Sequence, residues 1–175
     1  PLPTLSSGES LYLFNIALTP ISGSGFMLYD KLVATSGLSG TVTTAQTVNS
    51  TSLPRYTDGV GVELWLEWYT ATGSTIVTAI ISYTNQAGTS GRTATAAIAA
   101  STPANRMFRV TLAAGDTGVR SVQTVTLSAT TGTAGNFGIS LMKKIITIPI
   151  SAANPALLSP IECGLIKLSD YGASQ

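Results

Sequence analysis

The sequence predicts an all-β fold: an antiparallel two-sheet β-sandwich, jelly-roll-like, with extended terminal segments. Short apolar or alternating runs recur about every 8 to 15 residues, separated by Gly, Ser, Thr and Asn clusters, as in sandwiches and barrels. The 175 residues include 26 threonines and 20 serines, and no segment shows the 3.6-residue apolar period of an amphipathic helix. Eight or nine strands without a helix pack most simply as two sheets.

The clearest strand covers residues 62–69, where side chains alternate between two faces. The face predicted to be core carries Val62, Leu64, Leu66 and Trp68. The opposite face carries Glu63, Trp65, Glu67 and Tyr69. A turn and the β-branched run 75–84 follow, so the sequence predicts a hairpin between 62–69 and 75–84.

Further strands are predicted at residues 11–18, 26–34, 93–99, 107–112, 119–129, 137–150 and 160–168. The Thr- and Ser-rich stretch 36–52 has few large apolar groups and is predicted to be a long surface loop or an edge excursion.

Three segments are expected along the chain. Residues 1–9 form an N-terminal extended arm, and residues 10–144 form the β-sandwich domain. Residues 145–175 are C-terminal strands or an arm that contacts the sandwich or a neighbouring subunit. Three prolines in this last segment, Pro149, Pro155 and Pro160, restrict it to sheet edges and turns.

The composition argues against catalysis. The chain has no histidine, one cysteine (Cys163) and eight carboxylates, whereas histidine is the commonest base and metal ligand near neutral pH. We therefore expect no enzyme activity, no catalytic residues, no metal site and no cofactor. Only 10% of the residues are charged and the net charge is +1, which suits either a component of an assembly or a secreted β-protein with a hydroxyl-rich surface.

The sequence also argues against two kinds of partner. Nucleic-acid-binding proteins usually carry a basic stripe, and here the only adjacent basic pair is Lys143 and Lys144. No uninterrupted apolar run reaches the roughly 18 residues that span a bilayer. Neither a nucleic acid nor a membrane is expected as partner.

Glu63 and Glu67 flank Trp65, an arrangement that superficially resembles a sugar-cleaving cleft. Four residues along a strand separate the two backbones by about 13 Å, whereas glycosidase carboxylates lie about 5 to 9.5 Å apart. The face is therefore read as a solvent or interface face, with glycan binding through Trp65 and Tyr69 as the alternative.

Basic side chains supply the other candidate contacts. Arg106, Arg109 and Arg120 surround the loop that contains Asp116, and together with Lys143 and Lys144 they are candidates for subunit contacts through partner carboxylates. A solvated loop rim is the alternative for the three arginines.

Three runs resemble virion structural proteins encoded by tailed bacteriophages. They are Leu-Pro-Arg-Tyr-Thr-Asp-Gly-Val-Gly-Val-Glu-Leu-Trp-Leu-Glu-Trp-Tyr at 53–69, Ser-Tyr-Thr-Asn-Gln-Ala-Gly at 82–88, and Ala-Gly-Asp-Thr-Gly-Val-Arg-Ser-Val at 114–122. The likeness covers about residues 30 to 144. It implies a capsid-associated β-sandwich on the phage head surface. Its partners would be the major capsid protein and copies of itself, as a homo-oligomer with a trimer as one candidate state.

The leading hypothesis is a non-enzymatic virion structural protein of the capsid decoration or cement type. It would stabilise the assembled phage head by binding the lattice and not its free subunits. One alternative is a carbohydrate- or receptor-binding β-sandwich module of a phage tail or a secreted protein. A second alternative is a major capsid or coat jelly-roll protein.

Overall fold

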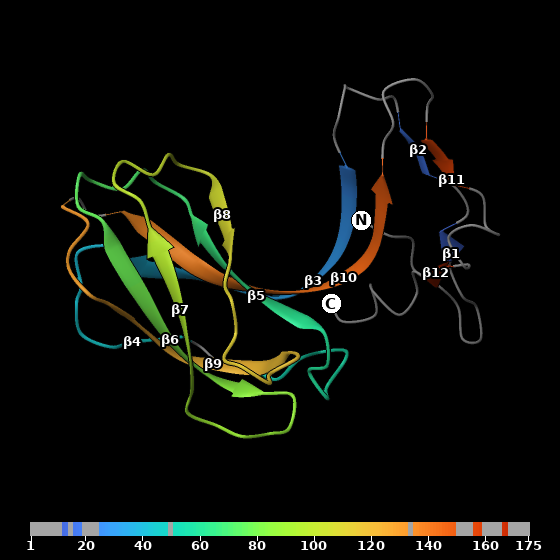
Figure 1. The fold of residues 1–175 in the computed structure, drawn as a ribbon, viewed down its shortest axis with the longest axis horizontal. Coiled ribbons are helices and arrows are strands. Elements are labelled where there is room, and N and C mark those ends of the chain that lie inside the picture. Colours follow the sequence, from blue (N-terminus) through green and yellow to red (C-terminus); the bar gives the residue numbers. More distant parts are fainter. Residues whose placement is uncertain are drawn as a thin grey trace. The chain divides into compact units, whose positions relative to one another are not determined.

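The computed structural model describes residues 12–13, 16–18, 25–48, 51–132, 135–149, 156–158 and 166–167, and their regular elements are all β-strands (Figure 1). Among these residues, no helix is long and apolar enough to cross a membrane. The chain divides into a terminal unit, residues 1–30 with 144–175, and a sandwich unit, residues 31–143. Residues 10–30, which we expected in the sandwich domain, fall in the terminal unit. The expected arm at 1–9 lies outside the described residues.

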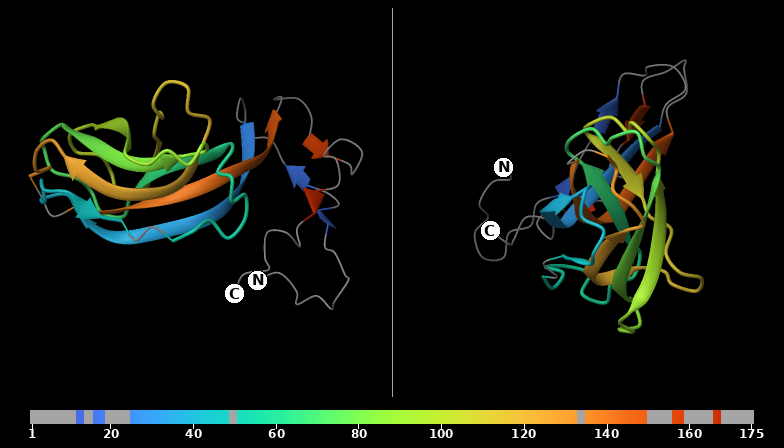
Figure 2. Two further views of the ribbon diagram at one scale, coloured as in Figure 1. Left: turned by 90° about the horizontal axis from the view of Figure 1, so that it is seen from below. Right: turned by 90° about the vertical axis from the view of Figure 1, so that its left-hand side faces the viewer.

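Two four-stranded antiparallel sheets build the sandwich and confirm the predicted all-β architecture (Figure 2). The first sheet has the order β3-β10-β5-β8 and the second the order β4-β9-β6-β7. The strands are β3 (Gly25–Ser39), β4 (Gln46–Thr47), β5 (Val62–Trp68), β6 (Val77–Asn85), β7 (Arg92–Ile98), β8 (Arg106–Arg109), β9 (Val119–Leu127) and β10 (Asn136–Pro149).

Two further ladders lie in the terminal unit. β1 (Tyr12–Leu13) pairs with β12 (Ile166–Lys167), and β2 (Ile16–Leu18) pairs with β11 (Ala156–Leu158), both antiparallel.

The pairings of the described strands are nested. β6 pairs with β7, β5 with β8, β4 with β9 and β3 with β10, and the ladders β2–β11 and β1–β12 continue the series outward. In each pair the two strand numbers add up to thirteen. The described strands therefore pair in the order of one long hairpin with its tip between β6 and β7, and the inner pairs belong to the two sheets of the sandwich.

Among the described residues, the core lies between the two sheets of the sandwich unit. Its 22 buried apolar residues run from Leu32 to Leu141. The four side chains that the alternation of 62–69 placed in the core are at most 1% exposed, which confirms that prediction. At one end of β5, the rings of Trp68 and Phe137 stack with centroids 4.4 Å apart, a geometry that adds to the burial of their apolar surface.

The predicted hairpin between 62–69 and 75–84 is wrong. β5 lies between β10 and β8, whereas β6 lies in the other sheet between β9 and β7. Both strands bury every second side chain. Their apolar faces can therefore meet across the core, and the connection between them crosses from one sheet to the other.

For the stretch 36–52 the sequence left a long surface loop or an edge excursion open, and the structure favours the edge position, because β3 and β4 are edge strands of the two sheets. β3 continues to Ser39 and β4 forms at Gln46–Thr47. Leu38 and Val48 are 6% and 4% exposed, so each anchors its segment to the core. The side chain of Gln46 accepts a hydrogen bond from Ser39 N at 2.7 Å and donates one to Ser39 O at 2.9 Å, which closes the turn between the two strands.

Candidate functional site

The outer face of β5 carries the four side chains that the sequence singled out, each partly buried: Glu63, Trp65, Glu67 and Tyr69. The face is shielded by its neighbours. Ser140, paired with Trp65, is fully buried, and Met142, paired with Glu63, is 8% exposed. Figure 1 shows β5 between β10 and β8.

Glu63 is held by two neighbours on this face. Its Oε2 accepts a hydrogen bond from Trp65 Nε1 at 3.2 Å, and its Oε1 lies 3.4 Å from Arg109 Nη2. The Glu63 side chain is 11% exposed, while that of Arg109 is 63% exposed. The guanidinium therefore presents most of its surface to solvent beside the indole.

Glu67 has a separate set of partners. Lys31 Nζ lies 3.0 Å from its Oε2, and the hydroxyl of Ser140 donates to the same oxygen at 2.9 Å. Burial opposes ionisation of Glu67, but the hydrogen bonds from Lys31 and Ser140 outweigh it, so the pKa of this carboxyl lies below its usual value. Glu63 and Glu67 thus serve different partners and do not share a proton or a ligand position.

Tyr69 closes one end of the face. Its hydroxyl donates to Thr35 O at 3.3 Å. Burial and the nearby charge of Glu67 raise the pKa of the Tyr69 hydroxyl.

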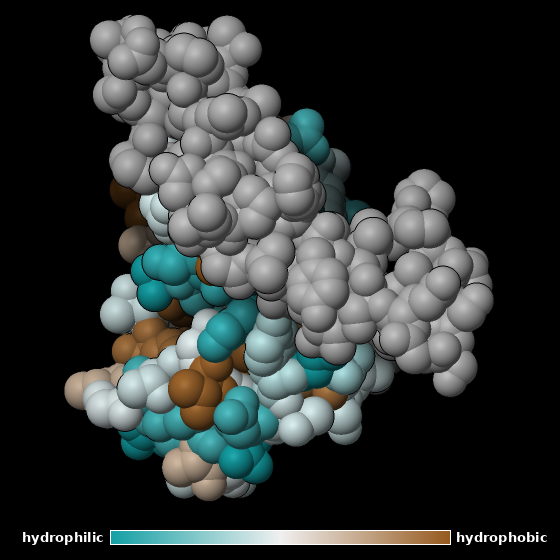
Figure 3. All heavy atoms as spheres, turned by 90° about the vertical axis from the view of Figure 1, so that its right-hand side faces the viewer, coloured by the Kyte–Doolittle hydropathy of each residue, from teal (hydrophilic) through white to brown (hydrophobic). Residues whose placement is uncertain are grey.

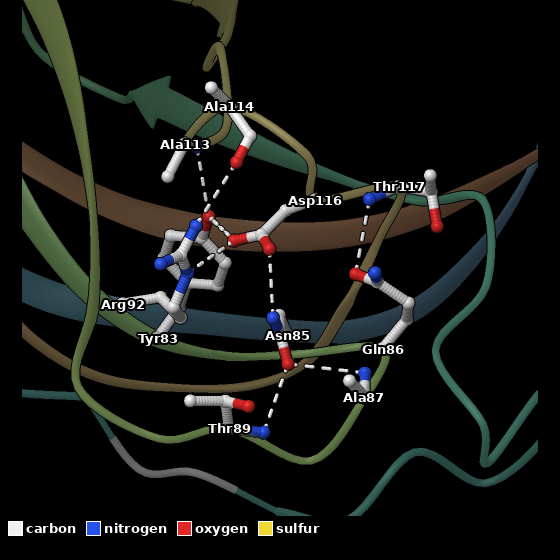
Figure 4. Close-up of polar contacts among 10 residues, drawn as sticks. All are labelled: Tyr83, Asn85, Gln86, Ala87, Thr89, Arg92, Ala113, Ala114, Asp116 and Thr117. Atoms are coloured by element: carbon white, nitrogen blue, oxygen red, sulfur yellow. Dashed lines mark hydrogen bonds and ion pairs between the residues drawn. The ribbon is translucent and has the colours of Figure 1, made fainter.

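A second polar cluster centres on Asp116 (Figure 4). Tyr83 Oη donates a short hydrogen bond to Asp116 Oδ2, Arg92 Nε donates to the same oxygen at 2.8 Å, and Asn85 Nδ2 donates to Oδ1 at 2.8 Å. Tyr83 Oη also accepts from Ala113 N at 2.9 Å. The cluster joins β6, β7 and the loop before β9, so it fixes that loop to the second sheet.

The cluster holds Asp116 ionised. Hydrogen bonds from Arg92 and Tyr83 lower the pKa of Asp116 to about 2, because they favour the charged form. Burial, together with the hydrogen bond to Asp116, raises the pKa of Tyr83. The Asp116 side chain is 4% exposed, and three donors already engage its two oxygens, so we assign it to the support of the loop.

Between these two clusters lies a pocket of about 440 Å³. It forms where the chain leaves β8. Val110 N donates to Leu64 O at 2.8 Å, but the next residue, Thr111, bridges to Thr95 in the other sheet. The predicted strand 107–112 therefore ends early. The lining residues are Gly61, Val62, Glu63, Leu64, Arg109, Val110, Thr111, Leu112, Asp116 and Thr117.

The basic residues proposed as subunit contacts have different surroundings. Arg106 and Lys144 are exposed. Arg120 donates to Asp58 O and Gln86 O, so its guanidinium holds two loops together. Lys143 Nζ donates to Val60 O at 2.6 Å and lies 5.3 Å from the centre of the Tyr56 ring. The structure thus brings Glu63, Trp65 and Arg109 together, and engages Arg120 and Lys143 internally.

Sequence reasoning missed Arg92 as the partner of Asp116. The two residues are far apart in the sequence and belong to no common motif. The only local signal was Asn85 and Arg92 flanking the turn between two β-branched runs.

In the part of the chain that the structure describes, no three His, Cys, Asp or Glu residues lie close enough together to hold a metal ion. In the coloured part of Figure 3, apolar and hydrophilic residues lie interspersed in small groups. Among the described residues, the large apolar side chains that are exposed are Met27, Val42, Val60, Ile76, Ile80 and Met107.

These observations define a class: an all-β sandwich protein in which the carboxylates of Glu63, Glu67 and Asp116 are paired with cations of the same fold. Comparison of the chain with protein-family models, with curated proteins and with solved structures found no match.

Proposed function

We propose that the chain is a non-enzymatic structural protein of a tailed-phage particle, a decoration or cement protein that binds and stabilises the assembled head. The observation that carries the proposal is the strand order. Counted from β3, the eight sandwich strands follow 1-8-3-6 in one sheet and 2-7-4-5 in the other. This order is the one expected of a hairpin rolled into a jelly roll, a fold that viral capsid domains use, and it supports the proposal.

The chemistry of the described side chains is consistent with this role. Glu63, Glu67 and Asp116 each lie in an ion pair, so these three carboxylates are engaged within the scaffold. A decoration protein acts by mass action, because a ligand that binds only the assembled lattice lowers the free energy of that lattice.

A test uses particles purified from the biological source of this sequence. We expect the purified chain to sediment with shells that lack it and to raise their disassembly temperature. A chain that ends at Lys144 retains the part of β10 that pairs with β5, so it should fold but fail to sediment with shells. Normal decoration by the shortened chain would contradict the proposal.

A coat protein is the second candidate, because the same strand order occurs in shells built of jelly rolls. It differs in one outcome: the purified chain alone would assemble into closed shells visible by electron microscopy.

Lectin domains share the jelly-roll fold as well, which keeps glycan binding through Trp65 and Tyr69 as a further alternative. It predicts a selective signal on a glycan array that Trp65→Ala removes. The proposed capsid role predicts no such signal.

A further inference from the structure

Two ion pairs on the outer face of the first sheet are oriented alike. In the pair of Lys31 and Glu67, the side chain of the cation is 46% exposed and that of the carboxylate 21%. In the pair of Arg109 and Glu63, the corresponding fractions are 63% and 11%. The carboxylates therefore lie against the sheet, while the cations reach the solvent. The charge that this face presents to a partner is thus mainly positive, although each pair as a whole is neutral.

The surface between these two cations has the residue types of a protein interface. In the register of β5 and β8, Met107 pairs with Glu67 and Arg109 pairs with Trp65, and directly paired residues share one face of a sheet. Met107 is 39% exposed and Trp65 is half-buried. Aromatic residues, Met and Arg are enriched in protein interfaces, and Trp and Arg are frequent hot spots. We call the surface formed by Lys31, Trp65, Met107 and Arg109 the cationic face.

The pocket described above adjoins the cationic face, because Arg109 belongs to both. The loop that follows β8 is tied to β5 at its two ends: Val110 N donates to Leu64 O at 2.8 Å, and Gly61 N donates to Thr117 O at 2.9 Å. Between these two bonds the loop and β5 border the pocket of about 440 Å³. Ligand pockets measure about 300 to 1,000 Å³, so this one has room for a side chain of a partner beside the guanidinium.

We infer that the cationic face receives an acidic segment of a protein of the assembled head, with a carboxylate of that segment bound by Arg109 and an apolar side chain packed on Trp65 and Met107. The contact of Arg109 Nη2 with Glu63 is 3.4 Å long, whereas charge-assisted hydrogen bonds measure about 2.7 to 2.9 Å. The planar fork of the guanidinium is therefore able to take a second, closer carboxylate.

The apolar centre of the face favours a protein over a nucleic acid, which is bound by a continuous basic stripe. The inference rests on the proposed function, and it names a contact beside the one expected of the segment after Lys144.

Co-sedimentation of the full chain with shells that lack it, measured at several salt concentrations, tests the inference. Arg109→Gln should raise the dissociation constant at least about 30-fold, the size of a hot-spot loss. The affinity of the unchanged chain should fall as the salt concentration rises, because salt screens the contact between cations and carboxylates. The matched control is Arg106→Gln, the same change of charge on the same strand. Arg106 is exposed and pairs with Trp68, whose side chain points into the core, so it lies on the other side of the sheet and its variant should bind like the unchanged chain.

The outcomes separate the inference from the proposed function. Shells that do not bind the unchanged chain would overturn both. Shells that bind the unchanged chain and Arg109→Gln equally, or that lose Arg106→Gln to the same extent, would overturn the inference alone. If Arg109→Gln alters the near-UV circular dichroism of the buried Trp68, Lys31→Gln at the other end of the face decides by the same criterion. Equally tight binding of a double-stranded DNA fragment at the same salt concentration would also overturn the inference, because the cations would then bind phosphates.

Discussion

At Asp116, a single carboxylate ties the two strands β6 and β7 to the loop before β9. Its pKa lies near 2, whereas an aspartate in an unfolded chain titrates near about 3.9. Because the folded pKa is the lower one, the carboxylate contributes stability above about pH 4 and loses that contribution as the pH falls toward 2.

Asp116→Asn should therefore lower the free energy of unfolding at pH 7 and flatten its decline between about pH 4 and pH 2. Urea titrations across this range measure both effects. Asp58→Asn is the control, because Asp58 lies in an exposed turn and accepts from Val60 N at 3.1 Å. An equal flattening in the control would show that the cluster around Asp116 is not the cause.

Gly138 lies at a position where a side chain has no room. A Cβ atom there would overlap the carbonyl oxygen of Thr35 and lie 2.8 Å from Tyr69 Oη. Gly138→Ala should cost about 3 kcal/mol, the upper end of the usual cost of overpacking.

A substitution at Gly37 serves as the control that distinguishes atomic overlap from backbone strain. It has a φ of +87°, and a Cβ added there would meet no atom within 4 Å, so Gly37→Ala should cost only about 1 kcal/mol, the strain of a left-handed residue. Thermal unfolding of both variants gives the comparison, and equal losses would refute the close approach at Gly138.

Among the elements, the strands were predictable and their partners were not. The alternation of 62–69 is a local pattern, and the burial of β5 follows it residue by residue. The neighbours of β5 are β10 and β8, which lie far along the chain. No local pattern specifies them, and for this reason the nearby run 75–84 was wrongly paired with it.

For the candidate site, too, the local pattern could be predicted but the partners from other strands could not. The outer face of β5 could be read from the sequence, because period two places Glu63 and Glu67 together on one face. The cations that pair with these two carboxylates could not be read from the sequence, because Lys31 and Arg109 reach them from β3 and β8. Contacts of this kind depend on the sheet order, which the sequence pattern leaves open.

The nested pairing predicts where folding starts. β6 and β7 are joined by a short turn, so the loop closed by their pairing costs little entropy, whereas β3 and β10 are separated by most of the sandwich unit. Ile98→Val in β7 and Ile139→Val in β10 remove the same methylene from positions that are 0% and 1% exposed. Each should cost about 1 kcal/mol.

Stopped-flow kinetics distinguishes the two variants. Ile98→Val should mainly slow folding, because its contacts form early, and Ile139→Val should mainly speed unfolding. The reverse assignment would mean that the hairpin tip is not the starting point.

At the scale of the whole molecule, the chain has few charged residues and no histidine, and the structure shows what some of its charged side chains do. Of the eight carboxylates, Glu63, Glu67 and Asp116 stabilise the sandwich through internal ion pairs. The eight sandwich strands follow the order of a rolled hairpin, a topology that viral capsid domains use. This is the physical basis on which we propose a particle component.

The most direct test of this account is immunogold electron microscopy of virus particles released from the biological source of the sequence, with antibodies against the purified chain. We predict gold on the outer surface of the heads, at many copies per particle. Particles free of label, with the chain confined to the soluble fraction, would contradict the account.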